Sequence, residues 1–157
     1  MDRSLIETYA AGGEKLALAI RGLTREDMTC FPIPGTWSIL QVVVHLMDSD
    51  LIGADRMKRI AAEDNPTLIG YDETRFIERL FPHDQDPNAC VQIFDLNRKA
   101  FAKILRKLPD DVFKRSGTHN EVGVVSLGKM IAKYVEHLEH HLKFIHDKRA
   151  KMGKEMW

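Results

Sequence analysis

Hydrophobic residues recur along the chain at intervals of three and four, which is the spacing of amphipathic helices. We find no convincing alternation of hydrophobic and polar positions that would predict strands. The periodic segments are long, and connectors that contain proline or glycine separate them. We therefore expect an all-α protein with four long helices, at residues 3–22, 38–63, 86–108 and 126–151.

The starts of three of these helices carry capping signals. Ser38 opens a capping-box pattern, and Asp86 precedes a proline at the first helical turn. Ser126 stands in the capping position of the last helix. Of the connectors, residues 66–85 are predicted to form a loop with one short helix, and residues 109–124 a polar loop.

Length and charge narrow the class of protein. A chain of 157 residues is expected to form one domain, residues 1–157, with a sizeable hydrophobic core. The 23 basic and 23 acidic residues balance and no basic run stands out, so neither nucleic acid nor a membrane surface is an expected partner. The first residues lack a signal-peptide pattern, which favours a cytoplasmic protein. Cys30 and Cys90 are far apart and are expected to be reduced core thiols.

Four of the seven histidines fall in the segment YVEHLEHHLKFIH, residues 134–146. On a helix, His137 and His141 point only about 40° apart, at the edge of the hydrophobic face, whereas His140 points toward solvent. Two imidazoles with this spacing can bind one metal ion. His45 borders the hydrophobic face of the second helix and offers a third ligand, although each of these histidines could instead be an ordinary structural residue.

Other polar residues are candidates for roles around such a site. Asp48 lies one turn beyond His45 and could orient an imidazole or accept a proton, or be a solvated carboxylate. Arg56 could hold an anionic substrate or pair with a carboxylate. The connector residues Tyr71, Asp72 and Glu73 could cover the site or simply begin a helix.

Some polar residues are expected to have structural roles. Asp50 and Asn97 fall within the hydrophobic faces of their helices, where a buried polar group needs a partner. We expect Asn97 or Arg98 to satisfy Asp50 across the helix interface. His83 and His119 lie in predicted loops, where exposure to solvent is the default.

Two segments resemble a known family. GTWSILQVVVHL, residues 35–46, is similar to the second-helix motif of the DinB/YfiT-like superfamily, and HLEHHLKFI, residues 137–145, is similar to its last-helix motif. The linker at residues 56–76 also resembles one branch of that family, so the resemblance spans nearly the whole chain. It implies an up-down four-helix bundle, a homodimer, and a divalent metal ion held by three histidines. Position by position, the implied ligands are His45, His137 and His141.

The chain departs from the family motif at one place, and the resemblance leaves open which reaction the site would catalyse. Leu142, Lys143 and Phe144 stand where many relatives have Arg-Gly-Gln, which affects contacts around the ligands and at a dimer interface. Three neutral imidazoles and an open position suit Zn²⁺ or Ni²⁺ and permit hydrolysis of a small-molecule substrate. Transfer of a low-molecular-weight thiol to an electrophile is the alternative chemistry that the resemblance implies. A non-catalytic, metal-stabilised helical dimer acting as a binding module is the third possibility.

Overall fold

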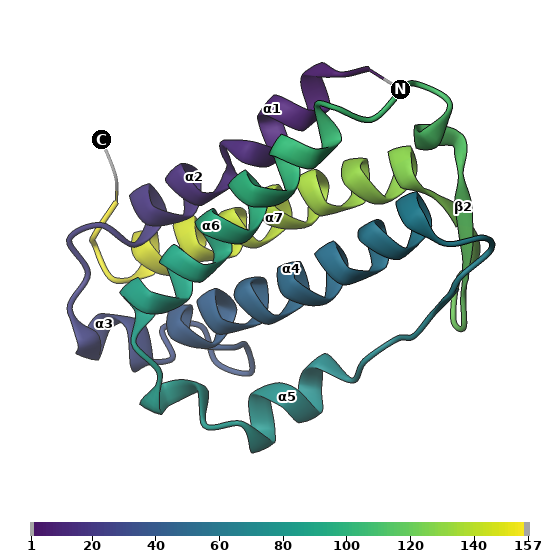
Figure 1. Cartoon of the computed structure of the whole chain (residues 1–157). Helices are drawn as coiled ribbons and strands as arrows, with labels where there is room; N and C mark the ends of the chain where they lie inside the picture. Colours follow the sequence, from purple (N-terminus) through teal and green to yellow (C-terminus); the bar gives the residue numbers. More distant parts are fainter. Residues whose placement is uncertain (1, 156–157) are drawn as a thin grey trace.

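The computed structural model describes residues 2–155, and four long helical segments dominate it (Figure 1). The first segment consists of two consecutive helices, α1 (Ser4–Ala10) and α2 (Gly12–Ile20), and the other three are α4 (Ile39–Ala62), α6 (Pro87–Leu105) and α7 (Leu127–Lys151). The connectors carry the short helices α3 (Arg25–Thr29) and α5 (Glu73–Arg79), and the 3₁₀ turns η1 (Pro82–Asp84) and η2 (Val112–Lys114). The expected all-α four-helix fold is confirmed.

The predicted capping residues begin their helices as expected. The Ser38 hydroxyl accepts a hydrogen bond from the backbone N–H of Gln41, and the Gln41 side chain accepts one from the backbone N–H of Ser38. Asp86 accepts from the backbone N–H of Asn88 at the start of α6, and Ser126 caps α7 in the same way. Local side-chain chemistry therefore sets where three of the four long segments start.

The first helical segment is interrupted at Ala11, where a single uninterrupted helix was expected. The next two residues are Gly12 and Gly13, and glycine is a weak helix former. A side chain at Gly12 would collide with Arg98, and one at Gly13 would collide with Asp95. The two glycines thus allow this segment to approach α6 closely, at the expense of a continuous helix.

The four segments form a bundle in which two pairs of neighbouring segments run in the same direction, α4 with α6 and the α1–α2 segment with α7 (Figure 1). The α1–α2 segment packs against α6 and α7, and so does α4. Figure 1 shows α4 and α6 running in parallel, because the connector at residues 63–86 carries the chain back along the bundle before α6 begins. This long return places α5 alongside α4.

A small sheet forms where a polar loop was expected. Strands β2 (Ser116–His119) and β3 (Gly123–Ser126) pair antiparallel, and β1 (Thr67–Leu68) pairs parallel to β2. Strands of two to four residues are too short to show a clear alternation of hydrophobic and polar positions. The pairing of β1 with β2 joins segments about fifty residues apart, so it depends on the bundle that brings them together.

A buried ionic network ties the bundle helices together, and it satisfies the expectation made for Asp50. The Nε of Arg98 lies 2.8 Å from Oδ1 of Asp50, and Nδ2 of Asn97 donates to Oδ2 at 2.8 Å. Arg98 also donates to the backbone carbonyls of Tyr9 on α1 and Tyr134 on α7, so it links α6 to these two helices as well as to α4.

Within residues 2–155, the helices are too short or too polar to cross a membrane.

Candidate metal centre

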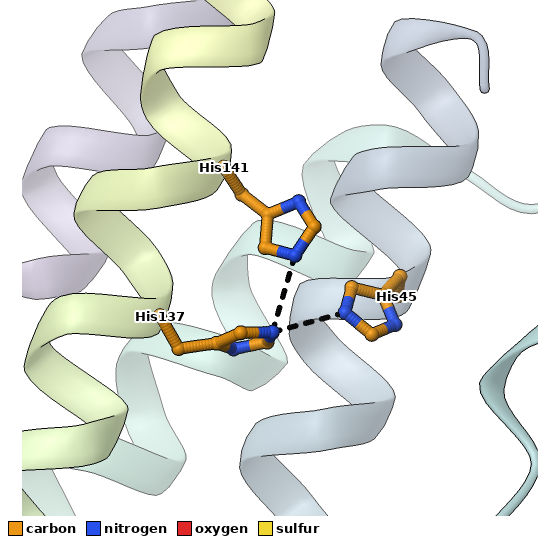
Figure 2. Close-up of side chains that lie close together, drawn as sticks. All are labelled: His45, His137 and His141. Carbon is orange, nitrogen blue, oxygen red and sulfur yellow. Dashed lines mark hydrogen bonds between the residues drawn. The ribbon is translucent and has the colours of Figure 1, made fainter. Parts of the chain in front are cut away.

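Three histidine side chains from two helices converge at one point (Figure 2). His45 extends from α4, and His137 and His141 extend from successive turns of α7. The Nε2 atom of His137 lies 3.1 Å from Nε2 of His45 and 3.1 Å from Nε2 of His141. Ligands placed ~2.1 Å from a tetrahedral ion are separated by ~3.4 Å, so the three rings have the approximate spacing that one ion requires.

The electrostatics of these rings suit metal ligands. Burial lowers the pKa of His45 and of His137 to about 4, and that of His141 to about 3. For His137 and His141 the neighbouring imidazoles lower the pKa further, because two charged rings would repel each other. All three rings are therefore neutral at pH 7, with a lone pair available on each unprotonated nitrogen.

The residues around the three rings come from both local and distant parts of the chain. The ring of Trp37, just before the capping residue of α4, lies 5.1 Å from the ring of His45. His140 is exposed, as expected, and its ring contacts that of Phe144. The Nδ1 atom of His141 is buried and has no hydrogen-bond partner within the described residues. The structure thus separates His140 from the converging set, as the helical spacing predicts.

The connector before α5 reaches the same point. The hydroxyl of Tyr71 lies 3.5 Å from Nδ1 of His45, and the carboxylate of Glu73 lies 3.8 Å from its Nε2. Asp72, between them, accepts a hydrogen bond from the backbone N–H of Arg75 and caps α5. Tyr71 and Glu73 therefore border the histidines, whereas Asp72 fixes the start of the short helix that presents Glu73.

The two predicted catalytic residues lie in different surroundings. Asp48 is half-buried on α4, and burial raises its pKa. Within residues 2–155, no hydrogen bond or ion pair joins its carboxylate to the three histidines. Arg56 is buried, donates from Nε to the carbonyl of Ile69 at 3.1 Å, and lines a hollow of about 210 Å³ that also borders His137. Catalytic roles for Asp48 and Arg56 stay predictions.

The two loop histidines differ from the default expectation of solvent exposure. His119 lies on β2 and is buried, and its Nδ1 atom accepts a hydrogen bond from the backbone N–H of Glu121. His83 is half-buried in η1, where its Nε2 atom lies 2.9 Å from the hydroxyl of Ser38. Both expectations were wrong because the sheet and the returning connector cover segments that a sequence pattern assigns to solvent.

A cleft of about 510 Å³ lies directly against the histidines. His137 and His141 lie along it, Trp37 and Phe144 provide apolar walls, and Lys148 also lines it. Sequence reasoning did not identify Lys148 as a site residue, although it lies seven residues after His141 and so shares its helical face. Neither cysteine lines the cleft, and burial raises the pKa of Cys90 to about 11.

Comparison with known proteins identifies close relatives of this architecture. Residues 9–145 match the family model of the DinB superfamily. The chain is 32% identical over 123 residues to a proposed metal-dependent hydrolase of Oceanobacillus iheyensis, covering 78% of this chain and 71% of that one. It is 29% identical over 140 residues to YfiT of Bacillus subtilis, also named as a proposed metal-dependent hydrolase, covering 88% and 79% of the two chains.

Solved structures agree with this fold. The structure of YfiT from Bacillus subtilis, described as having an unusual four-helix bundle topology, superposes with a TM-score of 0.90 at 27% identity and covers 96% of this chain and 86% of that one. A mycothiol-dependent maleylpyruvate isomerase superposes with a TM-score of 0.68 at 11% identity, covering 89% and 58%. The second likeness concerns the fold alone.

Proposed function

Because the chain belongs to the DinB superfamily and three imidazoles converge beside a cleft, we propose that it is a metal-dependent hydrolase of a small-molecule substrate. The convergence of the three Nε2 atoms is the observation that carries the proposal. The proposed ligands are His45, His137 and His141, and Zn²⁺ or Ni²⁺ suits three neutral imidazoles. When bound, such an ion supplies a Lewis acid that activates a water or thiol nucleophile.

The side chains around the histidines have separate tasks in this proposal. If Nε2 of His45 held the ion, the ring proton would be on Nδ1, and this N–H would face the hydroxyl oxygen of Tyr71 at 3.5 Å, which would hold the ring in place. Burial raises the pKa of Tyr71 to about 12, so its hydroxyl stays protonated and neutral. Glu73 is the carboxylate nearest to His45 within residues 2–155, and we assign it as the group that accepts a proton from the nucleophile.

Hydrolysis is tested with metal-loaded protein and a panel of nitrophenyl esters and N-acyl amides. Wild type is expected to hydrolyse at least one of them, and His141→Ala is expected to lose that activity. Glu73→Gln is expected to lower kcat by roughly 10²-fold without loss of metal, as befits a proton acceptor. Glu78→Gln, at an exposed glutamate of the same short helix, is the matched control. Equal rates in wild type and His141→Ala would exclude metal-centred hydrolysis of these substrates.

A second function, transfer of a low-molecular-weight thiol to an electrophile, is the alternative that the family resemblance implies, and the cleft beside the three imidazoles gives it room. The thiol would have to come from solution, because Cys90 is buried with a raised pKa and neither cysteine lines the cleft. The assay uses alkyl halides and epoxides with and without added thiol. A rate that requires the thiol supports transfer, and a rate that is independent of it supports hydrolysis. A wholly inactive protein would favour the binding module.

A homodimer is part of the same proposal and is motivated by the family resemblance. Each chain has a mass of 18.0 kDa, so light scattering is expected to report twice this mass. The measurement is made across micromolar concentrations, where a stable dimer does not dissociate. A species of 18.0 kDa throughout this range would contradict the dimer.

A further inference from the structure

The cleft beside the histidines contains a buried lysine that has no ionic partner. Lys148 is only 2% exposed, and its ammonium group donates to the hydroxyl of Thr36 at 2.9 Å. Within residues 2–155, no carboxylate lies within ion-pair distance of it. An ammonium group has three hydrogens to donate, and the structure uses one of them on a neutral oxygen.

The other buried cations each donate two or more hydrogen bonds to oxygen atoms. Arg98 pairs with the Asp50 carboxylate, Arg56 donates to the Ile69 carbonyl, and Arg149 donates to the carbonyls of Ala19 and Arg21. These carboxylate and carbonyl oxygens offset the loss of hydration that burial imposes on a charge. At Lys148 the desolvation is not compensated in this way: burial lowers its pKa, and the nearby Asp147 opposes this effect only in part.

The position of Lys148 relates it directly to the three histidines. His141 and Lys148 lie seven residues apart on α7, which is two helical turns, so both face the cleft. Their Cα atoms are separated by roughly 10 Å along the helix axis. The ring of Phe144 lies between them, because its centroid is 5.7 Å from that of the His141 ring and 6.0 Å from Nζ of Lys148. Trp37 also lines the cleft.

We propose that this cleft takes an amphiphilic monocarboxylate, whose carboxylate pairs with Lys148 and whose apolar middle lies against Trp37 and Phe144. One ammonium group with one adjacent hydroxyl, that of Thr36, matches a single negative charge better than a phosphate dianion, which needs more donors. The far end of such a molecule, on the order of 10 Å away, reaches the histidines. The inference rests on the proposed function in one respect only, namely that the end of the molecule near the histidines is the end that reacts.

The test measures binding to metal-free protein, so that a carboxylate cannot coordinate an ion instead. Full-length protein in chelator is titrated by calorimetry with 4-phenylbutanoate and with its uncharged analogue 4-phenylbutanamide. Wild type is expected to bind the carboxylate at least about tenfold more tightly than the amide, the usual scale of a hydrogen-bonded charge pair. Lys148→Met keeps the apolar stem and is expected to remove this preference, whereas Lys148→Arg is expected to retain most of it.

Lys143→Met is the matched control, because Lys143 is an exposed lysine on the same helix and does not line the cleft. It is expected to bind both compounds like wild type, and circular dichroism checks that each variant is folded. Equal affinities of wild type for the two compounds, absence of carboxylate binding at millimolar concentration, or an unchanged preference in Lys148→Met would each overturn the inference. Binding in this titration, together with inactive metal-loaded protein in the separate hydrolysis assay, would contradict only the proposed function.

Discussion

The imidazoles of His45, His137 and His141 combine two properties that an isolated histidine lacks. Burial holds their pKa values at about 3 to 4, and helix geometry directs their Nε2 atoms toward one another. A histidine in solution titrates near pH 6.5 and exchanges its proton freely. The site therefore presents three neutral imidazoles, each with a lone pair for a metal ion, over a pH range in which free histidine is largely protonated.

Metal content is the most direct check of the assignment. We expect about one divalent ion per chain in wild type, and loss of the ion on replacing any one of His45, His137 and His141 by alanine, because two imidazoles hold an ion much more weakly than three. His140→Ala is the control, since this ring lies on the exposed side of α7 and is expected to leave the content unchanged. Elemental analysis after gel filtration measures the ratio. Full metal content in His137→Ala would rule the assignment out.

The free energy of unfolding of the metal-free, chelator-treated protein should depend on pH through these histidines. In the unfolded chain His141 takes up a proton near pH 6.5, whereas in the folded protein it does so only near pH 3. Between these values the unfolded state binds more protons, so the free energy of unfolding falls as the pH is lowered from 6.5 toward 3, and His141 contributes no pH dependence above this window. Urea titrations at several pH values measure the slope.

Two matched variants show whether His141 causes the slope of the free energy of unfolding against pH. His141→Gln is expected to flatten the decline between pH 6.5 and pH 4, because the group that takes up the extra proton on unfolding is gone. His146→Gln, at an exposed position of the same helix, is expected to decline like wild type. If His141→Gln and wild type show the same slope, the imidazole is not held neutral by its surroundings.

At the scale of helices, the three histidines lie on α4 and α7, and a side chain of α6 connects these two helices to the first segment. Arg98 of α6 reaches Asp50 on α4, the carbonyl of Tyr9 in the first segment and the carbonyl of Tyr134 on α7. Its guanidinium group also stacks over the ring of Phe94, 4.3 Å from the centroid. One buried side chain thus contacts all four long segments of the bundle.

Breaking this network should destabilise the protein strongly. Arg98→Met is expected to lower the free energy of unfolding by about 3–5 kcal/mol, because it leaves the Asp50 carboxylate buried without its cation. Replacing both partners, Asp50→Leu with Arg98→Met, is expected to cost less than the single change, since no uncompensated charge remains. Denaturant titration measures both. A double variant that is no more stable than the single one would show that the pair itself, and not the unpaired charge, dominates.

An exposed pair provides the contrast. Arg106 lies 2.8 Å from Glu7 at the surface, where water screens the interaction. Arg106→Met is therefore expected to leave the free energy of unfolding nearly unchanged in the same titration.

At the scale of the whole molecule, the site joins parts of the chain that are distant in sequence. An ion bound by His45 and His137 would link α4 to α7, and the connector that carries Tyr71 and Glu73 closes against the same point. A ligand that binds only the folded state stabilises it by mass action.

Adding Zn²⁺ to chelator-treated protein is therefore expected to raise the Tm. At a free concentration 100-fold above Kd the increase should be roughly 5–10 °C for a chain of this size. His140→Ala is expected to respond like wild type, and His141→Ala to show little or no increase. Differential scanning calorimetry measures the shift. A rise of equal size in His141→Ala would mean that Zn²⁺ stabilises the protein at another place.

Local interactions determined much of the fold and part of the site. Helices close hydrogen bonds between residues four apart, so the hydrophobic spacing and capping residues such as Ser38 and Ser126 predict where they begin. The same local geometry places His137 and His141 on one face of α7 and His140 on another. The choice of His45 as their partner came from its place on the hydrophobic face and from the family resemblance.

Only the tertiary structure decided the contacts between distant segments. The pairing of β1 with β2, the burial of His119 and the approach of Glu73 to His45 all depend on how the returning connector packs on the bundle. The same holds for Lys148, whose partner Thr36 is more than a hundred residues away. A periodic pattern reports which face of a helix is buried, but it contains no information about which side chain from another segment will lie opposite.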